Sequence, residues 1–364
     1  MFPNYHVSQT ARAVQRIMPQ RAGVFPSGPY GKPMANAVRS MASRPSYTSN
    51  QMYNFDECFA HRNIGYNSPH IASYVKENTR ILDVGCSTGA ITLSLAKHNP
   101  SGYVLGIDHE PGAIALAKQH AKEEGITNVE FRVTNAEDMD DIQDESFDIA
   151  HAHQVLLHVT YPITVLKEMR RVAKTGGIVA TRDNCHVFRH PEHPLLEQHV
   201  NKFIARSLAR GAHPVGSHLN HEWVNEAGFP WECIEMGAGS WDWSSPENKR
   251  NWTSGVLAGG LGPIEGIDRA ALEKEVEEWV KNPRTRIIAL DSWVIGHKNN
   301  YLCYYLQWKD KRLCSKQLDE GASSLFEMLR VLALPVTQRC PKSPPQEFYN
   351  MKQIAHSPDT PGNA

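Results

Sequence analysis

Short apolar segments alternate with longer amphipathic segments through the middle of the chain. The short segments are rich in Val, Ile and Leu, which is typical of buried β-strands. Two of the three longer segments begin at a proline and end before a glycine, as helices often do. The predicted strands are 80–84, 103–108, 129–133, 147–151 and 178–181, and the predicted helices between them are 90–98, 111–124 and 162–175.

Strands that are separated by helices of about 10–15 residues predict right-handed βαβ units. The fold class is therefore α/β, with a Rossmann-like, doubly wound and mostly parallel sheet. Beyond residue 182 the alternation fades, and two later segments, 231–236 and 293–297, are predicted to complete a seven-stranded sheet. The residues between them are predicted to be inserted, mostly helical covers. The predicted domain is 56–298, with its core at 70–185 and the two insertions at 184–228 and 239–288.

The two ends of the chain differ from this middle. The first 55 residues hold six basic residues, six prolines and no acid before Asp56. We interpret 1–55 as a disordered basic extension, with a mitochondrial presequence as the alternative. Residues 299–364 are predicted to be a C-terminal extension, disordered from about residue 335, where prolines accumulate. Neither end is expected to be needed for folding.

Composition changes this picture little, but it narrows the classes of partner. The 38 basic and 39 acidic residues leave a net charge of −1, so we expect no nucleic-acid partner. No segment approaches the roughly 18 apolar residues that a membrane span needs. The seven cysteines are scattered and form no C-x-x-C pair, which is typical of reduced thiols in a cytosolic protein. A cytoplasmic location is predicted, and the oligomeric state is left open.

A glycine-containing loop follows the first predicted strand. It reads Asp83-Val-Gly-Cys-Ser-Thr-Gly89, and Gly85 permits a tight turn beside the N-terminus of the next helix. Asp108 ends the second strand, 23 residues after Gly85, where an acid can accept hydrogen bonds from ribose hydroxyls. Ligands of doubly wound sheets bind at the carboxyl ends of the strands. The loop and the acid together therefore predict a nucleotide-type cofactor site.

The loop has three other interpretations. A dinucleotide site favours G-x-G-x-x-G, whereas this loop reads G-x-S-x-G. The same letters spell the nucleophile elbow of α/β-hydrolases, with Ser87 as nucleophile, but that fold needs several strands before the elbow. The loop would otherwise be an ordinary turn in a domain without activity. All three are less favoured than a cofactor loop of another type.

Residues 78–183 resemble the S-adenosylmethionine-dependent methyltransferases of the ubiquinone/menaquinone-biosynthesis type. The first matching motif is Ile81-Leu-Asp-Val-Gly-Cys-Ser-Thr-Gly89, and weaker similarity continues to about His297. Ser87 stands where the family commonly has glycine, and Asn135 where it more often has Asp. The other matching motifs are Val104-Leu-Gly-Ile-Asp108, Asn135-Ala-Glu-Asp138, Ser146-Phe-Asp-Ile-Ala-His-Ala-His-Gln-Val155 and Glu168-Met-Arg-Arg-Val-Ala-Lys-Thr-Gly-Gly177.

The resemblance implies S-adenosyl-L-methionine as the cofactor and assigns its contacts. Asp83 would face the amino group, Asp108 would hold the ribose, and Gln154 would close the pocket near the methyl group. Since an Asn oxygen accepts hydrogen bonds as Asp does, Asn135 can still meet the adenine amine. The implied cofactor-binding residues are Asp83, Gly85, Cys86, Ser87, Gly89, Asp108, His109, Asn135, Ala136 and Gln154.

Histidines near the end of the fourth strand are the candidate catalytic groups. Methyl transfer from a sulfonium mainly needs alignment of the acceptor, and a nearby base helps when the acceptor is a hydroxyl. His151 and His153 share a strand face, and His158 follows shortly after. We predict His153 and His158 as bases or acceptor-orienting groups, although a histidine with a purely structural hydrogen bond is more common.

Two further groups of residues lie in the inserted regions. Cys185, His186, His190 and His193 are loosely spaced and interrupted by prolines, so no metal site is predicted. Most of the tryptophans there should be packing residues, while one or two are expected to wall the acceptor pocket. These tryptophans are Trp223, Trp231, Trp241, Trp243 and Trp252.

The sequence as a whole predicts S-adenosylmethionine-dependent methyl transfer to a small organic acceptor, in a setting such as secondary metabolism. The inserted region 184–290 is expected to decide which acceptor is used, and the acceptor atom is left open. The alternatives are a methyltransferase for a quinone or sterol-like lipid, and a regulatory protein that binds the cofactor without transferring its methyl group.

Overall fold

The computed structural model describes residue 56 and residues 60–258 and 266–298. The two predicted terminal extensions, 1–55 and 299–364, lie outside these described residues, and so do the predictions made for them. Within the described residues, no helix is both long enough and apolar enough to cross a membrane.

A single seven-stranded sheet organises the described residues, with the strand order β3-β2-β1-β4-β5-β7-β6. The strands β3, β2, β1, β4 and β5 run parallel, while β7 is antiparallel to both of its neighbours. The predicted α/β fold class is therefore confirmed. The strands are β1 (Arg80–Val84), β2 (Tyr103–Asp108), β3 (Val129–Val133), β4 (Phe147–His153), β5 (Ala173–His190), β6 (Ile234–Asp242) and β7 (Arg286–His297).

Three helices connect the first five strands, and each begins where the sequence provides a helix start. Gly89, with a φ of 89°, precedes α6 (Ala90–His98). Glu110 caps α7 (Pro111–Glu123) by accepting a hydrogen bond from the backbone N–H of Gly112. Pro162 opens α8 (Pro162–Val172), as proline does at first helical positions. These starts agree with the prediction from the sequence.

Helices cover both faces of the sheet, and each strand contributes alternate residues to the two cores. Leu82 and Val84 of β1 face the core that contains Leu166 of α8, whereas Ile81 faces the core that contains Leu95 of α6. This alternation is what a doubly wound sheet requires. On the first of these faces lie also η1 (Gly216–Leu219) and α10 (Asn220–Glu226).

The last three strands are longer than the sequence predicted. β5 continues to His190 and pairs with β7 along that whole length, with a register shift between Asn184 and His186. Residues 184–190, 239–242 and 286–288 are therefore strands, which corrects the prediction that they belong to helical covers. Trp231 also lies outside the sixth strand, in the short 3-10 helix η2 (Trp231–Cys233).

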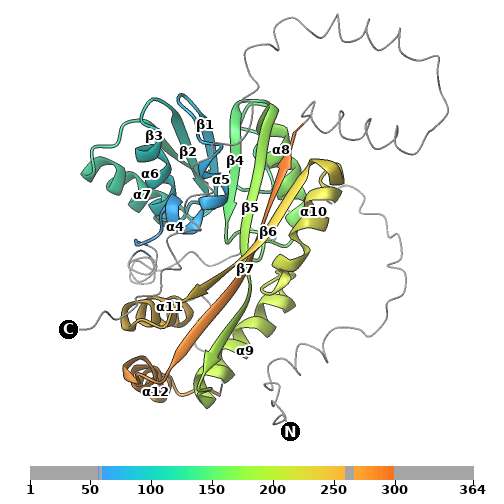
Figure 1. Ribbon diagram of the computed structural model, residues 1–364. Helices are drawn as coiled ribbons and strands as arrows, with labels where there is room; N and C mark the ends of the chain where they lie inside the picture. The colour runs from blue at the N-terminus through green and yellow to red at the C-terminus, as the bar shows by residue number, and fades with distance from the viewer. Residues whose placement is uncertain (1–55, 57–59, 259–265, 299–364) are drawn as a thin grey trace, which may run out of the picture. The chain divides into compact units, whose positions relative to one another are not determined.

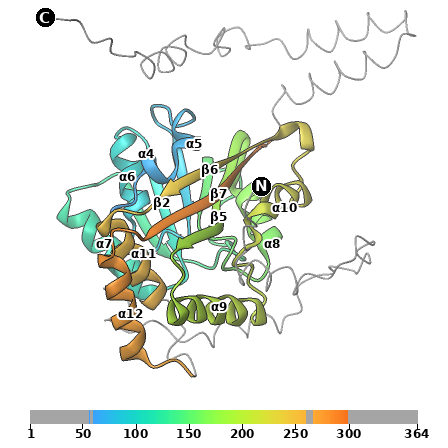
Figure 2. The same cartoon turned by 60° about the horizontal axis from the view of Figure 1, so that its bottom comes forward.

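The extended ends of these strands form an arm, which we define as residues 185–209 and 239–290. Figures 1 and 2 show three helices gathered around its far end. They enclose a second core, separate from the cores of the parallel sheet, in which Trp279 is fully buried against Leu196 and Ile287. The helices are α9 (Pro194–Ala209), α11 (Pro246–Ala258) and α12 (Arg269–Lys281).

Two short helices, α4 (Ile64–Asn67) and α5 (Pro69–Ala72), precede β1. Ile64 and Ile71 are buried in the core on the α6 face of the sheet. The backbone N–H of Ile64 also donates to Ser94 Oγ in α6 at 3.1 Å. The segment from residue 60 to residue 72, for which no helix or strand was predicted, thus packs against the sheet.

Candidate active site

The loop between β1 and α6 has the tight backbone that its glycines predicted. Gly85 has a φ of 68°, Ser87 one of 51° and Gly89 one of 89°, all in the region that favours glycine. A Cβ at Gly85 would lie 2.5 Å from Cγ2 of Val155. The loop after β4 therefore restricts this position to glycine, in addition to any ligand.

Asp108 lies at the end of β2 and holds the glycine loop in place. Its carboxylate accepts hydrogen bonds from the backbone N–H groups of Ser87 at 2.9 Å and Glu110 at 3.0 Å. His109 Nδ1 lies 3.2 Å from the same carboxylate. Burial opposes ionisation, but His109 and the two N–H groups outweigh it, so the pKa of Asp108 is below its ordinary value. Each carboxylate oxygen keeps lone pairs for further donors.

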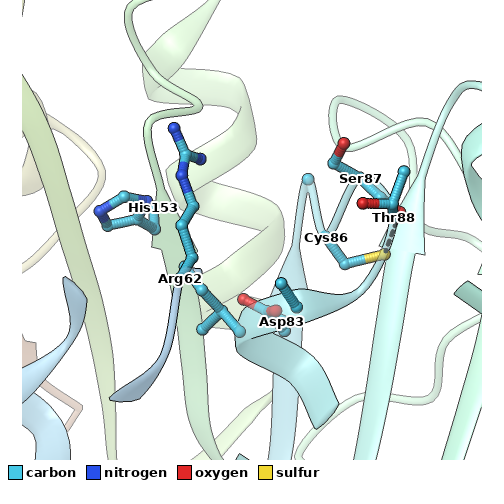
Figure 3. Close-up of a pocket in the computed structure, with 9 residues that line it drawn as sticks. Arg62, Asp83, Cys86, Ser87, Thr88 and His153 are labelled. Atoms are coloured by element: carbon cyan, nitrogen blue, oxygen red, sulfur yellow. Dashed lines mark hydrogen bonds between the residues drawn. The ribbon is translucent and has the colours of Figure 1, made fainter. Parts of the chain in front are cut away.

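A pocket opens beside this loop, and Figure 3 shows the side chains that face it. One wall is the loop itself, and the other carries Arg62, from the segment before α4, and His153, the last residue of β4. Asp83 and Arg62, two residues of opposite charge, thus both line this pocket. The lining residues are Arg62, Asp83, Gly85, Cys86, Ser87, Thr88, Ala90, Ile91 and His153.

His153 is buried, and its Nδ1 has no hydrogen-bond partner within the described residues. Burial, and after it the positive charge of Arg62, hold the pKa of His153 well below its ordinary value. The imidazole is therefore neutral near pH 7 and a weak base. It can accept a hydrogen bond from a ligand hydroxyl, which suits the orienting role better than the base role.

The other predicted residues occupy the same edge of the sheet without lining this pocket. Asn135 accepts a hydrogen bond from the backbone N–H of Glu137 at 3.0 Å, and Ala136 packs against the core. Gln154 has a φ of 59°, and its N–H donates to the carbonyl oxygen of Arg182 at 2.8 Å. His158 has an exposed side chain. The roles assigned to these four residues remain predictions.

The sequence reasoning missed Arg62 and the lining residues Thr88, Ala90 and Ile91. The last three belong to the glycine loop or to the start of α6, directly beside residues that were predicted. Extending the predicted site to the start of that helix would have included them. Arg62 precedes the first strand and belongs to no motif. Its position depends on the packing of α4 and α5 on the sheet, which no sequence pattern near Arg62 predicts.

The described residues also bear on the candidate metal ligands and the tryptophans. No three His, Cys, Asp or Glu side chains in the described ranges are grouped as metal ligands. Trp223 is buried in the α8-side core and is a packing residue. The ring of Trp241 instead contacts Arg182, whose guanidinium carbon lies 4.4 Å from the centroid of that ring. Among the described cysteines Cys86 and Cys185 are free, but Cys233 is disulfide-bonded, contrary to the expectation of reduced thiols throughout.

The sheet order separates the alternatives for the loop. Dinucleotide-binding folds use the order 3-2-1-4-5-6, whereas here an antiparallel β7 enters between β5 and β6. No strand precedes β1 in residues 60–79, where a nucleophile elbow at Ser87 would need several. The fold and the loop therefore define a Rossmann-like protein of a third type, neither dinucleotide-binding nor α/β-hydrolase.

Comparison with known proteins names that type. A family model described as a methyltransferase domain matches residues 75–228. An uncharacterized methyltransferase of Schizosaccharomyces pombe is 33% identical over 198 residues, which cover 51% of this chain and 69% of the relative. A probable methyltransferase, ltbC, of Aspergillus luteorubrus is 28% identical over 253 residues, covering 65% of this chain and 87% of the relative.

A ubiquinone biosynthesis O-methyltransferase of Hahella chejuensis is 31% identical over 134 residues, covering 37% of this chain and 54% of that protein. The chain belongs to the methyltransferase family. The resemblance stated from the sequence is confirmed, and so is the predicted enzyme class, that of a methyltransferase.

Proposed function

We propose that this chain binds S-adenosyl-L-methionine in the Arg62–Asp83 pocket and transfers its methyl group to a small organic acceptor, of the kind modified in secondary metabolism. The observation that carries the proposal is the pair of opposite charges in one pocket. An α-amino acid end group presents a carboxylate and an ammonium, which Arg62 and Asp83 complement.

The rest of the cofactor would extend along the strand ends toward β2. Asp108 keeps lone pairs for the two ribose hydroxyls while it holds the N–H of Ser87. His109, more than half exposed, would lie beside the adenine, and Asn135 and Ala136 would meet its edge. Cys86, Ser87 and Gly89 would contribute backbone contacts. These assignments follow the family resemblance onto residues that lie in order along one edge of the sheet.

When bound, the cofactor supplies a methyl group that is already activated on a sulfonium. The protein then has to align the acceptor and exclude water. His153 is the group best suited to this alignment, because it lines the pocket and its neutral imidazole can accept a hydrogen bond from an acceptor hydroxyl. Gln154, which follows it directly, would close the pocket near the methyl group. The exposed His158 would have to act from outside the pocket.

Calorimetry with S-adenosylmethionine and S-adenosylhomocysteine tests cofactor binding. Asp108→Ala should weaken binding at least tenfold, since two hydrogen bonds to a charged acceptor are worth about 1.5–3 kcal/mol each. Asp140→Ala, at an exposed acid, is the control and should bind like the wild type. Equal affinities of the Asp108 variant and the wild type, with both proteins folded, would refute the ribose assignment.

Mass spectrometry of a metabolite mixture after incubation with protein and cofactor tests the transfer itself. A methylated small molecule supports the proposal and reveals its acceptor atom. A methylated quinone or sterol-like lipid would support the alternative substrate class. Tight cofactor binding without any product would instead favour a regulatory protein.

A further inference from the structure

A chain of hydrogen bonds links four buried side chains from four separate parts of the fold. Ser68 Oγ lies 3.0 Å from His151 Nε2, and His151 Nδ1 lies 2.8 Å from Asp83 Oδ1. Thr92 Oγ1 donates to the other carboxylate oxygen of Asp83 at 2.6 Å. The four side chains are at most 2% exposed. The chain connects the turn between α4 and α5 with β4, β1 and α6.

The partners determine where the protons are. A carboxylate only accepts hydrogen bonds, so a neutral His151 carries its proton on Nδ1 and donates it to Asp83. Nε2 is then an acceptor, and Ser68 donates its hydroxyl hydrogen to it. With Thr92 also donating, both oxygens of Asp83 are held from the protein side. The carboxylate plane is therefore fixed while its remaining lone pairs are left for the pocket.

Serine, histidine and aspartate in this order also form the triad of hydrolases. Ser68 is fully buried here, however, and neither Ser68 nor His151 is among the residues that line the pocket. A nucleophile must reach its substrate. The arrangement is therefore placed to hold structure and not to attack an ester.

This chain of hydrogen bonds connects Asp83 with the segment that carries Arg62, the two charged residues of the proposed cofactor pocket. Ser68 follows Arg62 by six residues, across the short helix α4. Two other hydrogen bonds hold the same helix. The backbone N–H of Ile64 donates to Ser94, and Arg182 donates to the carbonyl oxygen of Asn67. Only the Ser68 contact continues through side chains to Asp83, which itself lines the pocket.

We infer that Ser68 and His151 are positioning residues, which hold the segment carrying Arg62 in register with Asp83, so that the two charges meet the amino acid end of the cofactor together. The inference rests on the proposed function and adds to it the device that assembles the site. It predicts that Ser68 acts on cofactor affinity through Arg62, whereas Thr92 acts through Asp83 alone.

A double-mutant cycle on S-adenosylhomocysteine affinity tests this difference. Ser68→Ala should weaken binding about fivefold, the effect of one lost hydrogen bond. In an Arg62→Met background the same change should weaken binding less than twofold, because the group that it positions is gone. Thr92→Val should weaken binding by a similar factor in both backgrounds, and Thr92→Ser, which keeps the hydroxyl, should restore it.

Two more variants separate positioning from general loss of stability. His151→Asn keeps an amide donor near Asp83 but cannot reach Ser68, so it should reproduce the effect of Ser68→Ala. Ser207→Ala removes a buried hydroxyl from α9, outside the site, and should leave affinity unchanged. Independent, multiplicative effects of Ser68→Ala and Arg62→Met would overturn the inference. So would an esterase activity that Ser68→Ala abolishes. A wild-type protein without cofactor affinity would overturn the proposed function as well.

Discussion

The parallel part of the sheet and the arm use the same chain in different ways. Strands β1 to β4 are five to seven residues long, and β1, β2 and β4 are largely buried. The pocket is lined by the loop after β1 and by His153 at the end of β4, together with Arg62. In the arm, β5, β7 and β6 are long antiparallel strands, with helices on one face. Among the described residues, none that lines the pocket belongs to the arm. The parallel part therefore supplies the described lining of the proposed cofactor pocket.

The root of the arm is nevertheless tied to the site by a buried ion pair. Arg182 Nε donates to Asp291 Oδ2 at 2.6 Å, and both side chains are almost fully buried. Arg182 also donates to the carbonyl oxygen of Asn67, which ends α4. Removing one partner of such a pair leaves an uncompensated buried charge, which is strongly destabilising. Arg182 and Asp291 thus mark the boundary at which the two regions of the molecule meet.

The largest effect is expected in the parallel part, from Gly85→Val. The new side chain would overlap Val155 Cγ2, and a β-branched residue is strained at a φ of 68°. The loop must then move, so calorimetry should detect no S-adenosylhomocysteine binding. Gly255→Ala in α11 is the matched control, since nothing lies within 4 Å of its Cβ. A folded Gly85→Val protein that binds within threefold of the wild type would show that the loop tolerates displacement.

The next largest effect is expected in the arm, from Trp279→Ala. Trp279 is fully buried, and its indole N–H donates to the carbonyl oxygen of Pro191 at 3.1 Å. The cavity should cost about 3–5 kcal/mol of stability. Because no described residue of the arm lines the pocket, S-adenosylhomocysteine affinity at a temperature where the variant is folded should stay within twofold of the wild type. A parallel loss of affinity would mean that the arm supports the cofactor site.

The same contrast explains which parts of the fold could be predicted from sequence. The limits of β1, β2 and β3 were predicted correctly, because β1 and β2 are buried apolar runs and β3 alternates apolar and polar residues. In β5 the polar residues after Asp183, such as Asn184 and His186, were assigned to a mostly helical insertion. They remain in a strand because β7, about 100 residues later, pairs with them. A partner so distant leaves no local pattern.

The site divides in the same way. Asp83, Gly85, Ser87 and Asp108 were predictable, because a motif within one βαβ unit brings them together. Arg62 and Ser68 were not, because they reach the site through the docking of α4 and α5 on the sheet. Their positions depend on tertiary contacts, which periodicity along the sequence does not report.

A smaller effect, specific to pH, is expected from Asp183→Asn at the boundary between the two regions. Burial raises the pKa of Asp183 to about 6, against hydrogen bonds from Asn220 and from backbone N–H groups of residues 155–157, which lower it. An acid with a raised pKa in the folded state binds protons more tightly there than in the unfolded state. Its ionisation therefore lowers stability as pH rises from about 4 to about 6.

The rise in the pKa of Asp183 from 3.8 to about 6 corresponds to about 3 kcal/mol of unfolding free energy. Relative to Asp183→Asn, the wild type should lose that much stability between pH 4 and pH 7, and denaturant unfolding at both pH values measures the difference. Comparing the two proteins cancels the other titrating groups. Parallel pH profiles would mean that Asp183 is already ionised in the folded protein at pH 4.

The smallest effect on stability and the most informative one on function is expected from Trp241→Ala. Trp241 comes from β6, at the root of the arm, and its indole N–H donates to Asp291 Oδ2. Its ring lies 4.1 Å from that of Tyr66 in α4, centroid to centroid, so it is a contact between the arm and the segment that covers the site. Since the ring is only partly buried, its loss should cost less than that of Trp279.

Asp291 keeps its bond to Arg182 when Trp241 is removed, so the pocket charges should stay in place and S-adenosylhomocysteine affinity should change less than twofold. The acceptor, in contrast, is proposed to be oriented by His153, and the Arg182 guanidinium that Trp241 covers is one of the charges that lower the pKa of that imidazole. Turnover with the acceptor found by mass spectrometry should then fall about fivefold, the factor of one lost contact of ~1 kcal/mol. Trp231→Ala, half exposed on η2 and away from Arg182, controls for the loss of a large aromatic side chain. If both variants turn over at the same rate, the arm does not reach the acceptor, and its role is confined to holding α4 in place.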